Sequence, residues 1–414
     1  MKALIMGFKS IVELHMDLKD LTILVGPPSS GKSNILEALA VLGYAYKATL
    51  EPYIEGYSSE KRTHIGAINS YIRSIVCHDL LNRFAGASSS NIRVDQVEVQ
   101  VTCGDDPNTV SISYRLHQNK DKLMVYNIKT RLARPSSQLL DVEEVADEGV
   151  IFLQFLSNLI QREKKPGKPL EVEQYQRSEG RFQVIAPRLY GFDRLYTTGN
   201  IMIGKTGSLY PVSYLDERAF NLSRILYTNS DILEYINDVL SGLSGVEVMP
   251  LSDGRLAFID RGREVGPSSV SDTVLRILYA YTALLASKPL EKEVEGGIHV
   301  RVLPLVMLEE PEAHIYPVAF YNLAEAVVES IAKGNKIVIT THSGRLAQVI
   351  WDHARKGGYT ASVYYIHRSI DRGTRLYTVN MMLLARQIED LDLIVNQPSE
   401  NIDQMVEDNI LTPV

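Results

Sequence analysis

Cysteine is scarce in this chain, with only two among its 414 residues. Cys77 and Cys103 lie far apart and do not have the paired spacing of a metal site. We therefore expect two buried thiols in a reducing compartment rather than a disulfide framework.

The chain also lacks an excess of positive charge, since its formal net charge is −7 and its isoelectric point is near 5.8. This balance argues against a globally basic nucleic-acid binder, although a local basic stripe would escape the count. The longest apolar helix candidate, residues 274–286, carries Arg276 and is too short to span a bilayer. Residues 1–12 contain Lys2 and Lys9 and no small-residue cleavage site. We expect a soluble, cytoplasmic protein with no signal peptide and no membrane partner.

Residues 135–243 contain no internal repeat and no sustained heptad run, which argues against a long coiled-coil arm. Helical periodicity near residues 150–159 and 214–243 predicts an inserted, mainly helical lobe instead. A basic run at residues 162–169 is interpreted as an exposed linker, with a nucleic-acid contact as the alternative. The sequence thus predicts three parts, at residues 1–134, 135–243 and 244–414.

What the chain does contain is a strand, a tight loop and a helix start within residues 22–39. The loop fits the phosphate-binding pattern G-x-x-x-x-G-K-[ST], with an apolar run before it and an amphipathic helix after it. Its residues are Gly26, Pro27, Pro28, Ser29, Ser30, Gly31, Lys32 and Ser33, followed by Asn34. The stretch predicts a nucleotide triphosphate site, and the flanking elements disfavour a chance match in a turn rich in glycine and serine.

The chemistry of each residue type supports this interpretation. Glycines at positions 26 and 31 let successive backbone N–H groups converge on phosphates at a helix N-terminus, where the dipole favours an anion. Lys32 is expected to reach the β and γ phosphates, and the Ser33 hydroxyl is a suitable ligand for Mg²⁺.

The remaining pattern predicts an α/β fold. Residues 1–12 and 14–25 predict two strands, residues 51–84 a helix, and residues 91–132 an antiparallel meander with period-two alternation. Within the meander, residues 119–122 are interpreted as a hairpin turn, because Lys122 cannot supply the carboxylate of a guanine-reading motif. A hairpin at residues 246–260 precedes strands and helices that alternate, at residues 302–308, 318–332, 336–340 and 344–353. This alternation predicts parallel βα units beside the phosphate loop.

Three acids, Glu309, Glu310 and Glu312, follow the apolar strand at residues 302–308. Acids at the carboxyl end of such a strand lie where open α/β sheets bind ligands. One could ligate Mg²⁺ together with Ser33, and the next could accept a proton from the attacking water. The alternative is a solvated acidic turn before a helix, whose dipole also suits glutamate.

The strand at residues 336–340 ends in Thr341, His342 and Ser343. A histidine there could contact the γ phosphate, and the two hydroxyls could bond nearby groups. Taken by itself, a single histidine is more often structural.

Together these motifs resemble the ABC-type ATPase heads of the RecF, SMC and OLD-like group, and specifically its stand-alone AAA-type ATP-binding proteins. The resemblance rests on residues 7–10, the phosphate loop with Asn34, a signature loop at residues 271–276, the acidic motif at residues 309–317 and the histidine loop at residues 340–343. It covers residues 1–45 and 245–370 well and implies a mixed sheet: antiparallel strands beside a parallel core, with an inserted helical lobe.

The resemblance also implies roles for individual residues. Two heads would enclose ATP as a homodimer, with the signature loop around Ser271 of one head closing on the γ phosphate held by the other. Glu310 would be the catalytic base, Glu309 the Mg²⁺-linked acid and His342 the γ-phosphate sensor. Lys9 would contact the base or ribose.

Three departures from the family pattern predict slow turnover. Glu309 stands where an aspartate is usual, Thr273 where a glycine is frequent, and Pro27 and Pro28 stiffen a loop that more often has asparagine at its second position. The family's conserved loop glutamine has three candidates here, which are Gln96, Gln100 and Gln154.

The sequence therefore predicts a Mg²⁺-dependent ATPase that couples dimer closure to its helical lobe, through which DNA or a partner protein would bind. The resemblance suggests a role in DNA maintenance or defence. The alternative is a nucleotide-gated binding protein in which hydrolysis is incidental. A P-loop kinase fits less well, because the loop at residues 340–343 suits an ATPase better than an acceptor-binding lid.

Overall fold

The computed structural model describes residues 1–51, 54, 77–82, 86–105, 109–118, 121–131, 181–191, 213–217, 219, 221–266, 269–294, 298–313, 315–369, 373–387, 391–395 and 401–414. The chain divides into two compact units, each with its own internal contacts. Unit 1 comprises Met1–His15, Glu37–Pro187 and Pro289–Leu303, and unit 2 comprises Met16–Leu36, Arg188–Lys288 and Pro304–Val414.

Unit 1 is built on a six-stranded sheet with the order β2-β1-β4-β5-β6-β7. The pairs β1–β4, β4–β5, β5–β6 and β6–β7 are all antiparallel, which confirms the predicted meander. The pairing of β6 with β7 extends to Gln118 and Asp121, as expected for the predicted hairpin. The strands are β1 (Lys2–Phe8), β2 (Ile11–Asp17), β4 (Ser89–Val94), β5 (Val97–Cys103), β6 (Thr109–Gln118) and β7 (Asp121–Arg131).

The first 25 residues form three strands rather than the predicted two, because a turn interrupts the first apolar run. Lys9 adopts a left-handed backbone conformation, with φ of 48°, and separates β1 from β2. The two residues between the strands, Lys9 and Ser10, are polar, and the prediction carried one strand through them. The third strand, β3 (Leu21–Val25), leads into the phosphate loop as predicted.

Cys77 and Cys103 form a disulfide with Cα atoms 5.7 Å apart, which corrects the prediction of two buried thiols. Cys77 begins a short 3₁₀ helix, η3 (Cys77–Leu80), whose Leu80 carbonyl accepts a hydrogen bond from the Lys9 N–H at 2.9 Å. This contact places η3 at the end of β1. Cys103 ends β5 at that same edge of the sheet, because Met6 pairs with Asn91 and Asn91 with Gln100. Tertiary folding therefore joins two cysteines whose spacing carried no signal.

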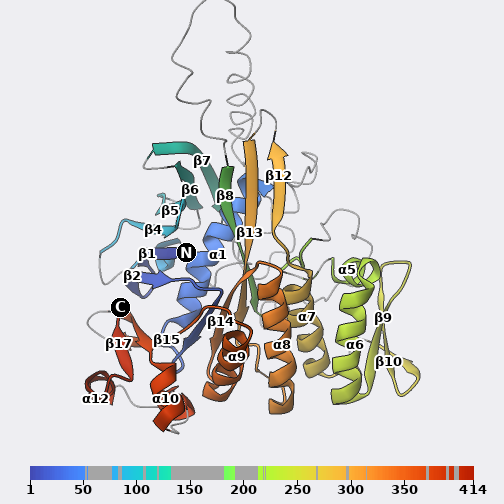
Figure 1. Cartoon of the computed structure of the whole chain (residues 1–414). Helices are drawn as coiled ribbons and strands as arrows, with labels where there is room; N and C mark the ends of the chain where they lie inside the picture. Colours follow the sequence, from blue (N-terminus) through green and yellow to red (C-terminus); the bar gives the residue numbers. More distant parts are fainter. Residues whose placement is uncertain are drawn as a thin grey trace, which may run out of the picture. The chain divides into compact units, whose positions relative to one another are not determined.

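The centre of unit 2 is the parallel part of an eight-stranded sheet with the order β12-β13-β14-β3-β15-β16-β17, in which β8 also pairs with β13 (Figure 1). The pairs β13–β14, β14–β3 and β3–β15 are parallel, which confirms the predicted βα units, whereas β15–β16 and β16–β17 are antiparallel. Besides β3, the strands are β8 (Arg181–Gly191), β12 (Leu290–Val294), β13 (Ile298–Glu309), β14 (Lys336–Thr341), β15 (Ala361–Ser369), β16 (Gly373–Val379) and β17 (Leu411–Pro413).

Helices of unit 2 lie side by side in Figure 1, where α8 contacts both α7 and α9. A small antiparallel sheet, ordered β11-β10-β9, packs against α6 and includes the predicted hairpin at residues 246–260. The elements are α1 (Lys32–Thr49, which continues into unit 1), α5 (Leu222–Thr228), α6 (Ser230–Ser244), α7 (Asp272–Ala286), η6 (Pro317–Ala319), α8 (Phe320–Ala332), α9 (Gly344–Lys356), α10 (Met381–Gln387), α11 (Leu391–Val395), α12 (Ile402–Glu407), β9 (Val246–Pro250), β10 (Leu256–Asp260) and β11 (Arg263–Val265).

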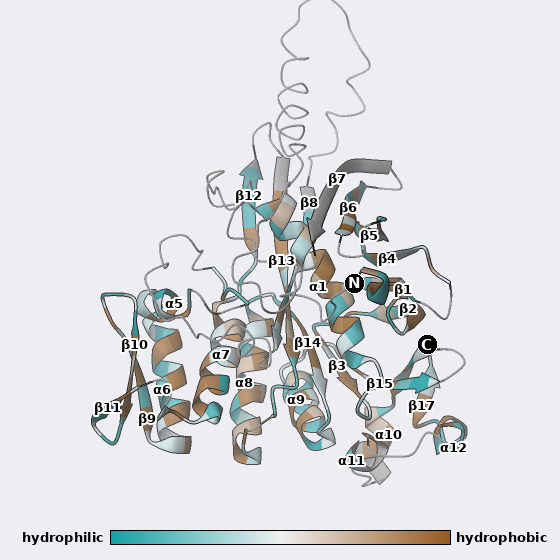
Figure 2. Cartoon of the chain, turned by 180° about the vertical axis from the view of Figure 1, so that it is seen from behind, coloured by the Kyte–Doolittle hydropathy of each residue, from teal (hydrophilic) through white to brown (hydrophobic). Residues whose placement is uncertain are grey.

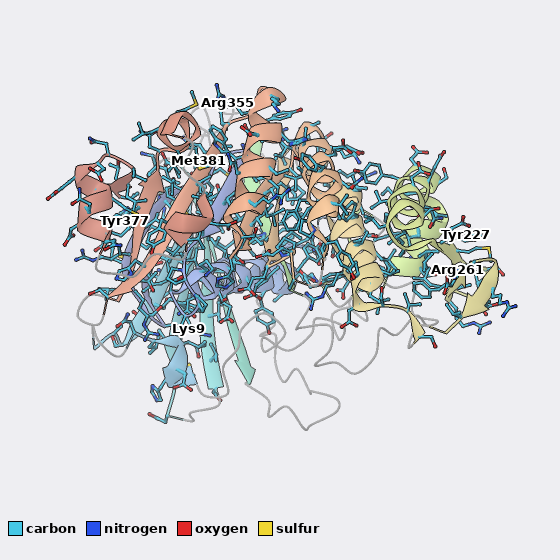
Figure 3. All side chains as sticks on the ribbon, turned by 90° about the horizontal axis from the view of Figure 1, so that it is seen from below. Lys9, Tyr227, Arg261, Arg355, Tyr377 and Met381 are labelled. Atoms are coloured by element: carbon cyan, nitrogen blue, oxygen red, sulfur yellow. A yellow bond between two sulfur atoms is a disulfide. The ribbon has the colours of Figure 1, made fainter. Side chains whose placement is uncertain are left out.

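Burial explains why these segments form a parallel core. All five residues of β3 and the last five of β14 are buried, and Figure 2 shows both strands as hydrophobic. Continuous apolar runs of this kind are typical of strands covered on both faces. The same core extends to the C-terminal elements, where Tyr377 and Met381, labelled in Figure 3, are buried.

The predicted division into three parts remains a prediction, because most of the expected lobe lies outside the described residues. Of residues 135–243, the structure describes β8, residues 213–217, 219 and 221, and helices α5 and α6, which pack with α7 in unit 2. The basic run at residues 162–169, Gln154 and most of the helix expected at residues 51–84 also lie outside the described residues. Within the described part of the chain, no helix combines the length and apolarity needed to cross a membrane.

Candidate nucleotide-binding site

The phosphate loop joins the end of β3 to the start of α1, both within unit 2. Gly26 has φ of 147° and Gly31 has φ of 107°, conformations that favour glycine. Space also requires glycine at position 26, because a Cβ atom there would lie 2.3 Å from the Ile366 carbonyl oxygen. Ser29 adopts a left-handed φ of 61° at a residue where that conformation costs about 1–2 kcal/mol. The loop therefore has the curled backbone that the sequence pattern predicts.

Lys32 is almost completely buried, and its ammonium group faces the loop. Its Nζ donates hydrogen bonds to the carbonyl oxygens of Gly26 at 2.7 Å and Pro27 at 2.9 Å. Burial lowers the pKa of the Lys32 ammonium to about 8, although the nearby carboxylates of Glu310 and Glu312 act in the opposite direction. Lys32 is thus a cation held by two backbone carbonyl oxygens, with two acids close enough to stabilise its charge.

Parallel pairing brings the other two predicted motifs to the same edge of the sheet. Glu309 at the end of β13 pairs with Thr340, and Thr341 at the end of β14 pairs with Val25. The phosphate loop, the acidic motif and the histidine loop therefore leave three adjacent strands at their carboxyl ends, where open α/β sheets bind ligands.

His342 connects these motifs directly. Its Nε2 lies 2.7 Å from Glu310 Oε1, and its Nδ1 lies 3.4 Å from Lys32 Nζ. The Glu310 backbone N–H donates to the Thr340 carbonyl at 3.0 Å, and its φ of 46° is again left-handed. The three side chains that the sequence predicted as catalytic are thus joined in one series of contacts, from Lys32 through His342 to Glu310.

A magnesium ion would require oxygen ligands near the phosphates. The Ser33 hydroxyl in the first turn of α1 and the buried Glu309 carboxylate are both hard oxygen donors, so their chemistry fits Mg²⁺. Within the described residues, no group of three or more His, Cys, Asp or Glu side chains could hold a metal.

The resemblance also linked several residues outside these three motifs to the nucleotide. Ser271 is exposed and caps α7, where its hydroxyl accepts a hydrogen bond from the Val274 N–H at 3.5 Å. Lys9, labelled in Figure 3, lies in unit 1 and forms an ion pair with Glu37. Gln96 and Gln100 lie in unit 1, and Gln100 Oε1 accepts from Arg115 at 2.7 Å. For these residues, a role at the nucleotide remains a prediction.

Sequence reasoning grouped Glu312 with its neighbouring acids but gave it no role of its own. In the structure, Glu312 Oε1 accepts hydrogen bonds from the Thr341 hydroxyl at 2.7 Å and from the His342 N–H at 2.8 Å. Burial raises the pKa of the Glu312 carboxyl, while these two hydrogen bonds act to lower it. Its position two residues after Glu310 in an acidic motif was the only signal in the sequence.

One protein family matches part of this chain. Residues 153–346 match the family described as "AAA domain, putative AbiEii toxin, Type IV TA system". The matched range includes Ser271, the acidic motif and His342, and it begins after the phosphate loop. The matched residues make up somewhat less than half of the chain. The search of the curated proteins found no match.

Two solved structures of SMC heads are similar to this chain. The SMC head domain from Thermotoga maritima is 14% identical, with 92% of this chain and 98% of that chain covered and a TM-score of 0.36. The Smc head domain with an extended coiled coil, bound to the C-terminal domain of ScpA and derived from Pyrococcus furiosus, is 13% identical, with 94% and 98% covered and a TM-score of 0.41. At these scores the likeness carries no functional argument.

Proposed function

We propose that the protein hydrolyses ATP with Mg²⁺ and that water attacks the γ phosphate. The observation that carries this proposal is the series of contacts from Lys32 through His342 to Glu310 at the carboxyl ends of three parallel strands. A buried lysine, a carboxylate and a histidine in contact can serve phosphoryl transfer to water, since its catalysis is mainly positioning and charge stabilisation.

Each residue has a distinct part in this chemistry. Lys32 and the N–H groups of the loop would stabilise negative charge on the phosphates, and Ser33 and Glu309 would hold Mg²⁺. The ion, when bound, would neutralise charge that develops on the phosphate oxygens. Glu310 would accept the proton of the attacking water, and its contact with the His342 imidazole at 2.7 Å would orient the carboxylate.

We further propose that two copies of the chain enclose ATP. Support comes from Ser271, which is exposed at the N-terminus of the 15-residue helix α7. An exposed helix N-terminus suits an anion, and the signature loop of one copy would complete the site of the other. ATP binding would then close the dimer, and hydrolysis would open it.

The cellular role that we propose is DNA maintenance or defence. The description of the matched family names a toxin of a type IV toxin–antitoxin system, which agrees with a defence role. DNA or a partner protein would bind through the predicted helical lobe at residues 135–243. Stimulation of hydrolysis by double-stranded DNA would support DNA as the partner.

Phosphate release from ATP, measured for the wild type and Glu310→Gln with and without double-stranded DNA, tests the proposal. Light scattering with and without ATP gives the oligomeric state of each. We expect wild-type turnover, a loss of at least about 100-fold in the variant, and an ATP-dependent dimer that accumulates in the variant. If neither protein hydrolyses ATP and both dimerise alike, the protein is a nucleotide-gated binder. Transfer of phosphate to an acceptor other than water would indicate a kinase.

A further inference from the structure

The segment that carries His342 lies just beyond the end of a strand, where sheet pairing no longer holds it. β14 ends at Thr341, and its parallel pairing with β13 ends at Glu309 and Thr340. Beyond that point, the Glu310 N–H still donates to the Thr340 carbonyl at 3.0 Å. The backbone N–H of His342, two residues after Thr340, donates instead to the Glu312 side chain, at 2.8 Å. A carboxylate thus continues the pairing after the strand has ended.

The same carboxylate oxygen organises the turn around His342. Glu312 Oε1 accepts from the Thr341 hydroxyl at 2.7 Å, and the Thr341 oxygen accepts from the Ser343 N–H at 2.9 Å. Ser343 in turn caps α9, because its hydroxyl accepts from the Leu346 N–H at 3.1 Å. One oxygen atom therefore holds the residue before His342 directly, and through it the residue after His342. The turn is thereby linked to the start of α9.

We propose that Glu312 is a positioning residue, whose Oε1 holds the turn at residues 341–343 so that the His342 imidazole contacts both Glu310 and Lys32. This inference rests on the proposed function and adds to it a residue that does not itself touch the reacting atoms. The orientation of the His342 side chain matters because a displacement of about 1 Å at a catalytic group can cost about 100-fold in rate.

The second carboxylate oxygen supports a positioning role over a chemical one. Glu312 Oε2 is buried and has no hydrogen-bond partner among the described residues. Oε1 accepts two hydrogen bonds, one from the Thr341 hydroxyl and one from the His342 backbone N–H. Acceptance of these two bonds requires an oxygen at one position and does not require a negative charge. Glutamine can supply that oxygen, and alanine cannot.

The test compares Glu312→Gln and Glu312→Ala with the wild type in phosphate release, in binding of a fluorescent ATP analogue and in thermal stability. Glu329→Ala is the matched control, because Glu329 is an exposed acid in α8 that pairs with Lys333 at 2.8 Å. We expect Glu312→Ala to lower kcat by about 10–100-fold and to change analogue affinity by less than about threefold. Glu312→Gln should keep kcat within about threefold of the wild-type value, and the Glu329→Ala control should have the wild-type kcat.

Hydrogen exchange at the His342 amide is a readout that does not depend on turnover. We expect faster exchange at residues 341–344 in Glu312→Ala than in the wild type, and wild-type exchange in Glu312→Gln. An equal loss of kcat in both variants would overturn the inference, since the charge and not the acceptor position would then matter. Wild-type exchange and kcat in Glu312→Ala would also overturn it. If the wild type itself does not hydrolyse ATP, the proposed function fails, and the exchange data still decide whether Glu312 holds the turn.

Discussion

Two single residues of the candidate site store backbone strain. Of the seven non-glycine residues with positive φ in the described part of the chain, two, Ser29 and Glu310, belong to the candidate site. Such conformations cost about 1–3 kcal/mol each and persist where the surroundings enforce them. Glu310 is held by its N–H bond to Thr340, so the turn of its backbone aims the carboxylate at His342. The strain is therefore consistent with a site shaped for its ligand.

Gly26 offers the sharpest test at this scale. Gly26→Ala would place a Cβ atom 2.3 Å from the Ile366 carbonyl oxygen, at a φ of 147° that side chains rarely adopt. We expect the free energy of unfolding to fall by about 2–4 kcal/mol and ATP binding to be lost, because the loop must shift to relieve the clash. Urea unfolding and titration with a fluorescent ATP analogue measure the two effects.

Gly242 provides a control of opposite sign. This exposed glycine lies inside α6, and an added Cβ atom would meet nothing within 4 Å. Gly242→Ala should therefore stabilise the protein by about 0.5–1 kcal/mol and leave nucleotide binding unchanged. Equal effects of the two substitutions would show that the Gly26 contact does not govern the loop.

At the scale of elements, Asp20 joins the amino ends of three adjacent strands, β14, β3 and β15, of which β14 and β3 lead to the candidate site. Its Oδ1 lies 2.5 Å from Lys336 Nζ at the start of β14. Its Oδ2 accepts from the Thr360 hydroxyl at 2.6 Å and the Thr360 N–H at 2.9 Å, just before β15. Asp20 itself precedes β3, so one carboxylate sets the relative positions of the strands that lead to the phosphate and histidine loops.

These contacts make the stability of unit 2 depend on pH. Burial alone would raise the pKa of Asp20, but the hydrogen bonds from Lys336 and Thr360 outweigh it and lower the pKa to about 2. A carboxyl group with a lowered pKa in the folded state stabilises the fold at pH values above its ordinary pKa. This contribution is lost as the pH falls from about 4 to about 2. We expect Asp20→Asn to lower the free energy of unfolding by about 1–2 kcal/mol at pH 7, with the difference vanishing near pH 2.

Urea unfolding of both proteins across this pH range measures the effect. Asp17→Asn is the control, because the Asp17 carboxylate is half exposed and lies 3.7 Å from an exposed lysine. An exposed ion pair contributes little to stability. The free energy of unfolding of Asp17→Asn should therefore stay within about 0.5 kcal/mol of the wild-type value at every pH. A constant difference between Asp20→Asn and the wild type would mean that Asp20 does not titrate as inferred.

For the whole molecule, the sequence predicted the parts whose chemistry is local. The phosphate loop, the acidic motif and the parallel strands each follow from residue type and spacing, and the structure contains all three. Two features could not be predicted, because they depend on where distant segments meet. These are the two hydrogen bonds of Glu312 and the pairing of Cys77 with Cys103.

That disulfide gives the last prediction, which concerns the stability of unit 1. It joins residues 26 apart in sequence, and in the chain-entropy model a loop of this size is worth about 3 kcal/mol, because the link restricts the unfolded chain. We expect a thiol reductant to lower the midpoint of thermal unfolding and to speed hydrogen exchange at the Lys9 amide, which η3 holds through the Leu80 carbonyl.

The double variant Cys77→Ala/Cys103→Ala separates the disulfide from other effects of the reductant. It should melt like the reduced wild type and should not respond to reductant, since these are the only cysteines in the chain. Thiol titration of the native protein should find no free thiol before reduction and two after it. Two free thiols in the untreated protein would contradict the disulfide and restore the interpretation of two buried thiols. The thermal comparison would then measure only the packing of the two side chains.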